Sequence, residues 1–127
     1  MSNKMINTDN APKAIGPYSQ AVKTDNLLYI SGQIPVDPTT NEIVENTFKA
    51  QTEQSMKNLL AILNEAGLDF NNVVKTTIFI TDMSKFAEVN EVYGKFFTDW
   101  FPARACVQVS CLPKNVLVEI EAIASFN

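Results

Sequence analysis

Two stretches near the end of the chain decide the fold that we predict: Phe101-Pro102-Ala103-Arg104-Ala105-Cys106-Val107-Gln108-Val109 and Val116-Leu117-Val118-Glu119-Ile120-Glu121. Both stretches alternate in the way that is typical of β-strands, and both are rich in Val and Ile. The segment between them is short and contains Pro113 and Asn115. A short connection favours antiparallel pairing, so we expect the two strands to form a hairpin.

The register of this hairpin would place Arg104 roughly opposite Glu121, and Cys106 roughly opposite Glu119, if the turn centres near Leu112. One face would then look like core, with Ala105, Val107, Val109, Val116, Val118, Ile120 and Ala122. The other face would be mixed, with Arg104, Cys106, Gln108, Glu119 and Glu121 beside Leu117 and Ile123. A cation, a thiol and carboxylates on a half-apolar face suggest a site for a small anionic molecule.

Composition restricts the classes of protein that the chain can represent. It has 127 residues with 46% hydrophobic and 19% charged content, which predicts one globular domain over residues 1–127. The net charge is −4 and no basic run occurs, so we expect neither nucleic acid nor a membrane as partner. No apolar stretch approaches about 18 residues, and the N-terminal segment lacks an apolar signal core.

Cysteine and histidine content limits the chemistry further. Two cysteines, Cys106 and Cys111, are too few for a disulfide framework, which favours a reduced, cytoplasmic location. The absence of histidine excludes a histidine base and a Ser-His triad. It also makes a structural zinc site improbable, so we expect no metal and no cofactor.

The order of elements predicts an α+β fold. Short strands are expected at 18–23 and 27–32, a helix at 47–66, a strand at 73–81, and a second helix from Lys85 to about Trp100. With the two final strands the order is ββαβαββ, which predicts one sheet with two helices on one face. The other face would be exposed unless something covers it, which predicts self-association and ligand sites between subunits.

Arg104 and Glu119 are the first candidates for chemistry. Arg104 is the one arginine in a chain with nine lysines. Its guanidinium can bind a carboxylate or phosphate through two parallel hydrogen bonds. The alternative is a structural salt bridge from Arg104 to Glu119 or Glu121. Glu119 could hold or activate a water if its surroundings raise its pKa, or it could simply pair with Arg104 or a backbone donor.

Four other residues have both a functional and an ordinary explanation. Thiolate activation requires a nearby base, so Cys106 is expected to line a pocket rather than to act as a nucleophile. Gly32 either lets the backbone approach a ligand or marks a bulge. Tyr18 and Ser31 are hydroxyl donors of a kind that is more often ordinary structure than site. Asn90 falls beside the apolar face of the second helix.

Four motifs show that the chain resembles the reactive-intermediate deaminase family, also called the Rid or YjgF family. They are Ala14-Ile15-Gly16-Pro17-Tyr18-Ser19-Gln20, Ser31-Gly32-Gln33-Ile34-Pro35, Phe86-Ala87-Glu88-Val89-Asn90-Glu91-Val92-Tyr93, and Pro102-Ala103-Arg104-Ala105-Cys106-Val107 with Val118-Glu119-Ile120-Glu121. The resemblance implies a chorismate-mutase-like fold and a homotrimer with sites at the subunit interfaces. It also implies hydrolysis of 2-imino acids or their enamine tautomers, such as 2-iminobutanoate and 2-iminopropanoate, to 2-keto acids and ammonia.

Carried over to this chain, the resemblance implies that Arg104 grips the substrate carboxylate and that Glu119 orients or activates the water. Tyr18, Ser31, Gly32, Asn90 and Cys106 would line the pocket. An imine carbon is already electrophilic, so holding the carboxylate and placing a water could suffice for hydrolysis. Two alternatives are a ribonuclease or translation inhibitor, and a non-enzymatic regulator or chaperone-like trimer that binds a small ligand.

Overall fold

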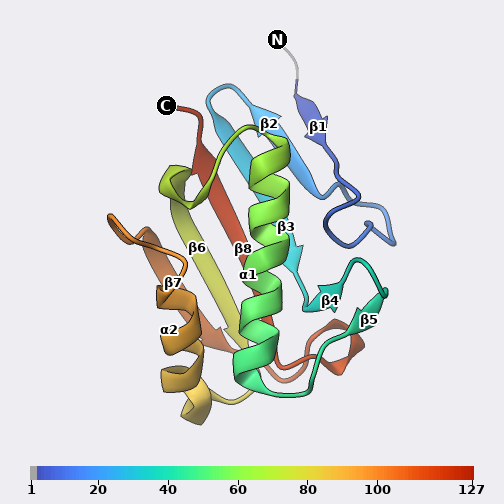
Figure 1. Ribbon diagram of the computed structural model, residues 1–127, viewed down its shortest axis with the longest axis vertical. Helices are drawn as coiled ribbons and strands as arrows, with labels where there is room; N and C mark the ends of the chain where they lie inside the picture. The colour runs from blue at the N-terminus through green and yellow to red at the C-terminus, as the bar shows by residue number, and fades with distance from the viewer. Residues whose placement is uncertain (1–2) are drawn as a thin grey trace.

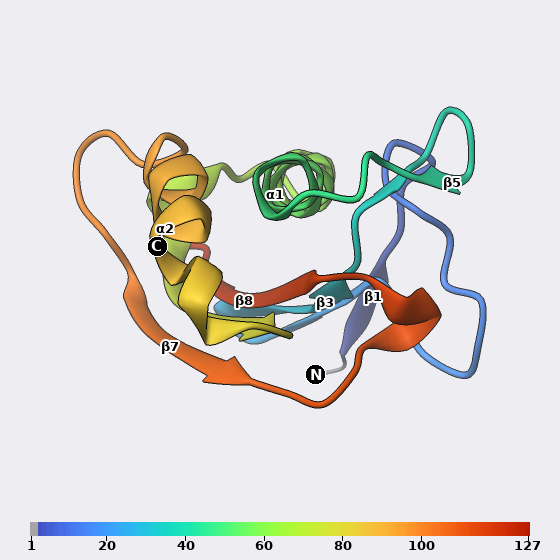
Figure 2. The same cartoon turned by 90° about the horizontal axis from the view of Figure 1, so that it is seen from below.

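Two helices lie on one face of a six-stranded sheet in the computed structural model, which describes residues 3–127 (Figure 1). The sheet order is β1-β2-β3-β8-β6-β7, and a separate pair, β4 and β5, lies beside it. The strands are β1 Lys4–Ile6, β2 Ala21–Thr24, β3 Leu27–Gln33, β4 Val36–Asp37, β5 Glu42–Ile43, β6 Val73–Ile80, β7 Ala103–Gln108 and β8 Val118–Ser125. Figure 2 shows both helices on the same side of the sheet, which confirms the predicted α+β arrangement.

The predicted elements are present in the predicted order, with three additions. β1 precedes them, and β4 and β5 form inside the segment 36–46, for which the sequence predicts no strand. Residues 1–2 belong to the N-terminal segment in which no signal core is expected, and they lie outside the described residues. Among residues 3–127, no helix is both long and apolar enough to span a membrane.

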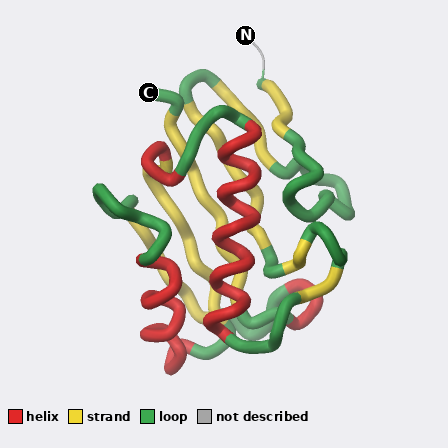
Figure 3. Tube along the Cα trace, in the orientation of Figure 1, coloured by secondary structure: helices red, strands yellow, loops and turns green. Residues whose placement is uncertain are grey.

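Helix α1, Phe48–Glu65, crosses one face of the sheet (Figure 3) and has a cap at each end. Thr47 has extended backbone angles, and its side-chain oxygen accepts a hydrogen bond from the Ala50 N–H at 3.1 Å. Just after the helix, Gly67 adopts a φ of +81°, the left-handed conformation that glycine adopts without strain. The helix buries its apolar stripe, Met56, Leu59, Ile62 and Leu63, against the sheet.

Helix α2, Phe86–Gly94, is shorter than predicted. A short 3₁₀ turn, Met83–Lys85, precedes it, and the helix ends at Gly94 rather than near Trp100. The chain then turns so that two aromatic rings reach the core. The rings of Phe96 and Phe97 pack edge-on against Phe70, with ring centroids 5.5 and 5.2 Å apart.

The predicted hairpin of the last two strands is wrong. β7 pairs in parallel with β6, while β8 pairs antiparallel with both β3 and β6, so that β6 separates β7 from β8. The physical reason is α2, which connects β6 to β7. A helix between two strands returns the chain to the same end of the sheet and makes the strands parallel.

The segment 109–117 therefore crosses the end of the sheet instead of making a tight turn. It contains a 3₁₀ turn, Pro113–Asn115, in which Lys114 and Asn115 both have a φ of +58°. Helix α1 holds this segment in place, because the Gln51 side chain accepts a hydrogen bond from the Leu117 N–H at 2.8 Å. The crossing positions Lys114 beside the pocket described below.

The predicted faces of β7 are consequently reversed. Arg104 and Cys106 are register partners of Thr76 and Ile78, which are fully buried beneath the helices. Arg104, Cys106 and Gln108 thus share the helix face, while Ala105 and Val107 lie on the opposite, open face. The faces of β8 are as predicted, with Val118, Ile120 and Ala122 in the core. The expected single mixed face, with arginine and glutamates together, is therefore split across the sheet.

The open face of the sheet carries exposed apolar side chains. Tyr29 on β3 is 46% exposed and Val107 on β7 is 42% exposed. Within residues 3–127 no helix covers this face (Figure 2). The feature on which we based the expectation of self-association is therefore present, and the association itself stays a prediction.

Candidate functional site

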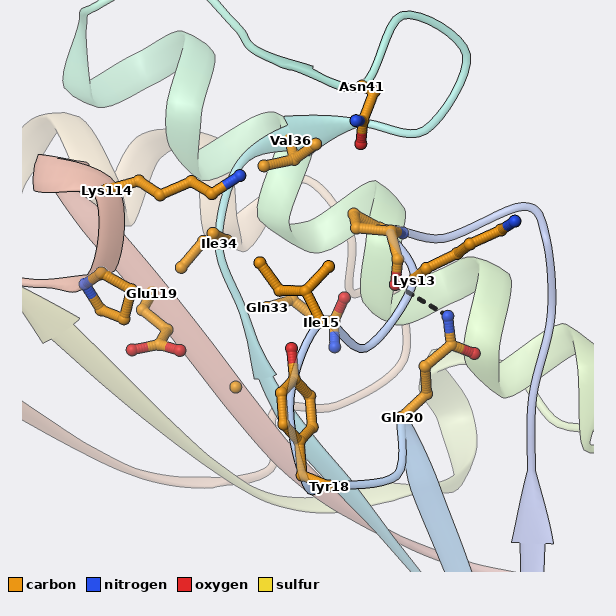
Figure 4. A pocket seen from close by; sticks show the side chains of 13 residues that line it. Lys13, Ile15, Tyr18, Gln20, Gln33, Ile34, Val36, Asn41, Lys114 and Glu119 are labelled. Atoms are coloured by element: carbon orange, nitrogen blue, oxygen red, sulfur yellow. Dashed lines mark hydrogen bonds between the residues drawn. The ribbon is translucent and has the colours of Figure 1, made fainter.

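A cavity of about 370 Å³ lies where the N-terminal loop meets β3 and β8. We call it the Glu119 pocket. Its lining residues are Pro12, Lys13, Ile15, Tyr18, Gln20, Gly32, Gln33, Ile34, Val36, Asn41, Pro113, Lys114 and Glu119. Figure 4 shows the Tyr18 hydroxyl and the Glu119 carboxylate directed into the same space. The pocket thus combines a carboxylate and a phenol with an apolar wall.

Gln20 fixes the loop that forms one wall of this pocket. Its side-chain amide donates to the carbonyl of Pro12 at 2.8 Å (Figure 4) and to that of Thr8 at 3.1 Å. Its carbonyl oxygen accepts from the Thr8 N–H at 2.8 Å. Because Gln20 is itself buried, these bonds hold the loop 8–20 in one arrangement and place Tyr18 beside β3.

Gly32 lies directly against the Glu119 side chain. The pairing of β3 with β8 is irregular between Ile30 and Gln33, so a bulge occurs here, as one of the two interpretations of the sequence predicted. A Cβ atom at position 32 would lie 2.5 Å from Glu119 Oε2 and 2.9 Å from its Cδ. Only glycine leaves the carboxylate in its present position. The other interpretation, that the Gly32 backbone approaches a ligand, stays a prediction.

Ser31 forms hydrogen bonds with the loop that precedes β2. Its hydroxyl donates to the Ser19 carbonyl at 2.6 Å, and its N–H donates to the Gln20 carbonyl at 2.9 Å. Both bonds attach the loop to β3 next to Tyr18. Ser31 is therefore next to Gly32 but is not one of the residues that line the pocket, and its hydroxyl is bonded to the backbone.

The environment of Glu119 favours its protonated form. Burial raises the pKa of this half-buried carboxyl, and repulsion from Glu121 on the same strand raises it further. A carboxyl with a raised pKa is a better proton acceptor near neutral pH than an ordinary glutamate. Glu119 therefore has the property that we required of a group that activates water.

Arg104 belongs to a second group of residues, on the helix face. Its Nη1 donates to Asn90 Oδ1 at 2.7 Å, and its Cζ lies 5.2 Å from the ring centroid of Phe86 and 5.1 Å from that of Tyr93. We call Phe86, Asn90, Tyr93, Arg104 and Cys106 the Arg104 cluster. The alternative of a salt bridge from Arg104 to Glu119 or Glu121 is wrong within this chain, because both glutamates lie on the other face.

Cys106 lies two residues along β7 from Arg104, on the same face. Burial raises the pKa of its thiol, and the nearby Arg104 charge offsets only part of this effect. The neutral thiol is a poor nucleophile, so the surroundings agree with a packing role. Among residues 3–127 no group of three His, Cys, Asp or Glu side chains is arranged to hold a metal ion.

The predicted site residues therefore form two groups within one chain. Tyr18, Gly32 and Glu119 meet in the Glu119 pocket, with Ser31 beside it, whereas Asn90, Arg104 and Cys106 meet in the Arg104 cluster. Sequence reasoning missed the roles of Phe86 and Tyr93 around the guanidinium. The signal was present, because residues 86, 90 and 93 follow the i, i+4, i+7 spacing of one helix face. Lys114 was also missed, since nothing local placed its turn at the pocket.

Comparison with known proteins identifies the family. The profile of the endoribonuclease L-PSP family matches residues 8–126. A RutC family protein from Pyrococcus horikoshii is 55% identical over 121 residues, which cover 95% of this chain and 96% of that protein. The 2-iminobutanoate/2-iminopropanoate deaminase of Mus musculus is 52% identical over 121 residues, covering 95% of this chain and 90% of that protein.

The fold agrees with this assignment. The crystal structure of YyfA from Yersinia pestis, a protein of unknown function of the conserved Rid protein family, superposes with a TM-score of 0.96. It is 50% identical, and the match covers 98% of this chain and 99% of that one. The expected chorismate-mutase-like fold is consistent with these neighbours. The chain belongs to the Rid/YjgF family, whose profile carries the description endoribonuclease L-PSP.

Proposed function

We propose that this protein hydrolyses reactive 2-imino acids, such as 2-iminobutanoate and 2-iminopropanoate, to 2-keto acids and ammonia. The observation that carries the proposal is Glu119, a half-buried carboxylate with a raised pKa that shares a pocket with the Tyr18 hydroxyl. Family membership supports it, because a relative with 52% identity bears the name of this activity. Many relatives carry only a family name, so the reaction itself requires the test given below.

The two groups of residues would act together if copies of the chain associate. Arg104 and Glu119 lie on opposite faces of the sheet, so one substrate cannot touch both within a chain. We propose a homotrimer in which the Arg104 cluster of one subunit faces the Glu119 pocket of the next. The exposed Tyr29 and Val107 on the open face supply apolar surface for such contacts.

In the assembled site, Arg104 would bind the substrate carboxylate. Nη1 already donates to Asn90, and the remaining N–H groups of the guanidinium are available for a two-pronged contact. This contact would place the imine carbon near Glu119. Holding substrate and water in this geometry supplies much of the catalysis, because the imine needs no further activation.

Hydrolysis then needs only proton transfers. Water adds to the imine carbon, one water proton passes to Glu119, and the nitrogen gains a proton, which gives a carbinolamine. A second proton on nitrogen makes ammonia the leaving group. The C–N bond breaks as the hydroxyl oxygen loses its proton and becomes the keto oxygen. In this proposal Glu119 relays these protons, and the Tyr18 hydroxyl in the same pocket donates one to the nitrogen.

The test is imine turnover against the spontaneous background. A pyridoxal-phosphate enzyme acting on threonine generates 2-iminobutanoate in situ, and ammonia and 2-ketobutanoate are followed with and without this protein. We expect the wild type to release ammonia and 2-ketobutanoate faster than the spontaneous reaction. With Arg104→Ala we expect release at the spontaneous rate. The same preparations are incubated with single-stranded RNA. No acceleration of imine hydrolysis would contradict the proposal, and RNA cleavage in its place would favour the ribonuclease alternative.

A further inference from the structure

We infer that Phe86 and Tyr93 are positioning residues that hold the Arg104 guanidinium in one orientation, ready for a two-oxygen anion. The inference deepens the proposed function, since it names what prepares the carboxylate-binding group. Its structural readout does not depend on that function. It begins from the two ring distances, 5.2 Å to Phe86 and 5.1 Å to Tyr93.

The guanidinium lies between the two rings. Phe86 and Tyr93 are seven residues apart on α2, a rise of about 10 Å along the helix axis. Arg104 Cζ is close to half that distance from each ring, and Asn90, which accepts its hydrogen bond, lies on the helix between them. Two rings and one acceptor therefore contact the guanidinium from the same helix and restrict its position.

Tyr93 is itself held from the strand that supports Arg104. Its hydroxyl and Thr76 Oγ1 are 2.7 Å apart, Tyr93 is 3% exposed, and Thr76 is fully buried. Thr76 is also the register partner of Arg104 in the parallel pair of β6 and β7. Thr76 of β6 thus contacts both parts of the arrangement: it pairs with the backbone of Arg104, and its hydroxyl bonds to Tyr93. Burial raises the pKa of Tyr93, which keeps the ring neutral beside the cation.

This arrangement has a consequence for binding. A free arginine side chain loses conformational entropy when it binds a ligand, because rotation about several bonds is restricted. A guanidinium that is already fixed loses much less of this entropy. Removing a ring should weaken binding of a carboxylate while leaving proton transfer at Glu119 intact. The expected signature is a higher KM and product Kd with a nearly unchanged kcat.

The structural test uses the fact that Arg104 is the only arginine in the chain, so its Nε–H gives a single NMR signal. Phe86→Leu and Phe86→Met remove the half-exposed ring, Tyr93→Phe keeps the ring but loses the Thr76 contact, and Phe126→Leu is the control. Phe126 holds another cation, Lys23, at 4.4 Å from its ring centroid, away from Arg104. We expect both Phe86 variants, but not Phe126→Leu, to shift the signal toward that of an unstructured arginine.

The functional test measures Kd for 2-ketobutanoate by calorimetry and KM and kcat for the imine. We expect about a 3- to 10-fold weaker Kd and higher KM for both Phe86 variants, kcat within about 2-fold, and recovery with Phe86→Tyr. Tyr93→Phe should have a smaller effect than either. An unmoved Arg104 signal, or an unchanged Kd in folded Phe86 variants, would overturn the inference. A wild type that binds no 2-keto acid and hydrolyses no imine would instead refute the proposed function. The NMR result would still show whether Phe86 and Tyr93 hold the Arg104 guanidinium in one orientation.

Discussion

Arg104 and Glu119 lie on opposite faces of one sheet, on strands that β6 separates. Arg104 on β7 is the register partner of Thr76, which is buried beneath the helices, whereas Glu119 on β8 is the partner of Phe79 on the open face. A small ligand held by Arg104 is therefore shielded from Glu119 of the same chain. Any mechanism that uses both residues at once requires a second copy of the chain.

Arg104→Lys should reduce imine turnover by about 100-fold or more while the protein stays folded. Lysine keeps the positive charge but loses the two-pronged geometry and the planar group that lies between Phe86 and Tyr93. Turnover is measured by ammonia release, and folding by circular dichroism. A folded variant with nearly normal turnover would rule out the carboxylate-binding role of Arg104.

Gly32→Ala should lower turnover by about 10-fold or more, because small displacements of a catalytic group are costly. The added Cβ would lie 2.5 Å from Glu119 Oε2, so the carboxylate must move. Gly94→Ala is the matched control, because a Cβ there meets nothing within 4 Å. It should keep full turnover and stabilise α2 by up to about 1 kcal/mol. Equal turnover in both variants would show that the position of Glu119 is unimportant.

Local features of the fold could be predicted from the sequence, and long-range pairing could not. The cap at Thr47, the left-handed Gly67 and the apolar stripe of α1 depend only on neighbouring residues, and the predicted helix at 47–66 agrees closely with the observed Phe48–Glu65. The pairing of β7 depends on which distant strand offers it an edge. The better signal was α2 itself, because a strand, a helix and a strand in sequence favour a parallel pair.

The error in pairing explains the error in the site. Side chains alternate along a strand, so the partner and the register decide which face Arg104 occupies. Residue types and the family resemblance identified Arg104, Glu119, Tyr18 and Gly32 as candidates, but neither could show that they fall into two groups. That division follows from the order of β8, β6 and β7 in the sheet.

Turnover should fall as the pH is lowered through the raised pKa of Glu119, because only the ionised carboxylate accepts a proton. The midpoint should lie above the ordinary value of 4.5, since burial and then Glu121 raise this pKa. Glu121→Gln removes the repulsion and should move the midpoint to lower pH. Glu119→Gln should abolish the acidic limb and lower turnover by about 100-fold, with product affinity retained.

The controls for this pH profile are a constant imine supply and a stability measurement. A raised carboxyl pKa means that the folded state binds the proton more tightly, so Glu119 costs stability above its folded pKa and not below its unfolded one. Glu119→Gln should therefore melt higher than wild type at pH 7, and the difference should shrink in acid. A midpoint unmoved by Glu121→Gln, or parallel losses of affinity and turnover in Glu119→Gln, would make Glu119 a structural residue.

Cys106→Ala should keep turnover within a few-fold of wild type. Burial raises the thiol pKa, and the side chain packs against the core, so we assign it a packing role and no covalent step. Cys111→Ala, at an exposed cysteine, is the control. Complete loss of turnover in a folded Cys106→Ala protein, or a covalent substrate adduct on Cys106 by mass spectrometry, would contradict this assignment.

Mixing two inactive variants should restore activity, because the Arg104 cluster and the Glu119 pocket of each site would come from different chains. Arg104→Ala and Glu119→Gln chains are unfolded together in equal amounts, refolded, and checked for trimer mass and subunit exchange by light scattering and differential tags. A site is intact when its Arg104 cluster comes from the Glu119→Gln chain and its Glu119 pocket from the Arg104→Ala chain. Random assembly of closed trimers gives about one quarter intact sites.

The matched control mixes wild type equally with a chain that carries both substitutions. Sites that lie between chains need two wild-type neighbours, so about one quarter of the sites stay active, whereas sites within a chain would leave about one half. The two mixtures together distinguish shared sites from sites within one chain, even if refolding yields vary. Each arrangement predicts a different ratio between the activities of the two mixtures. Equal activity in both mixtures requires shared sites. No recovery in the first mixture, with one half in the second, would show that each site uses Arg104 and Glu119 of the same chain, and would contradict the shared site.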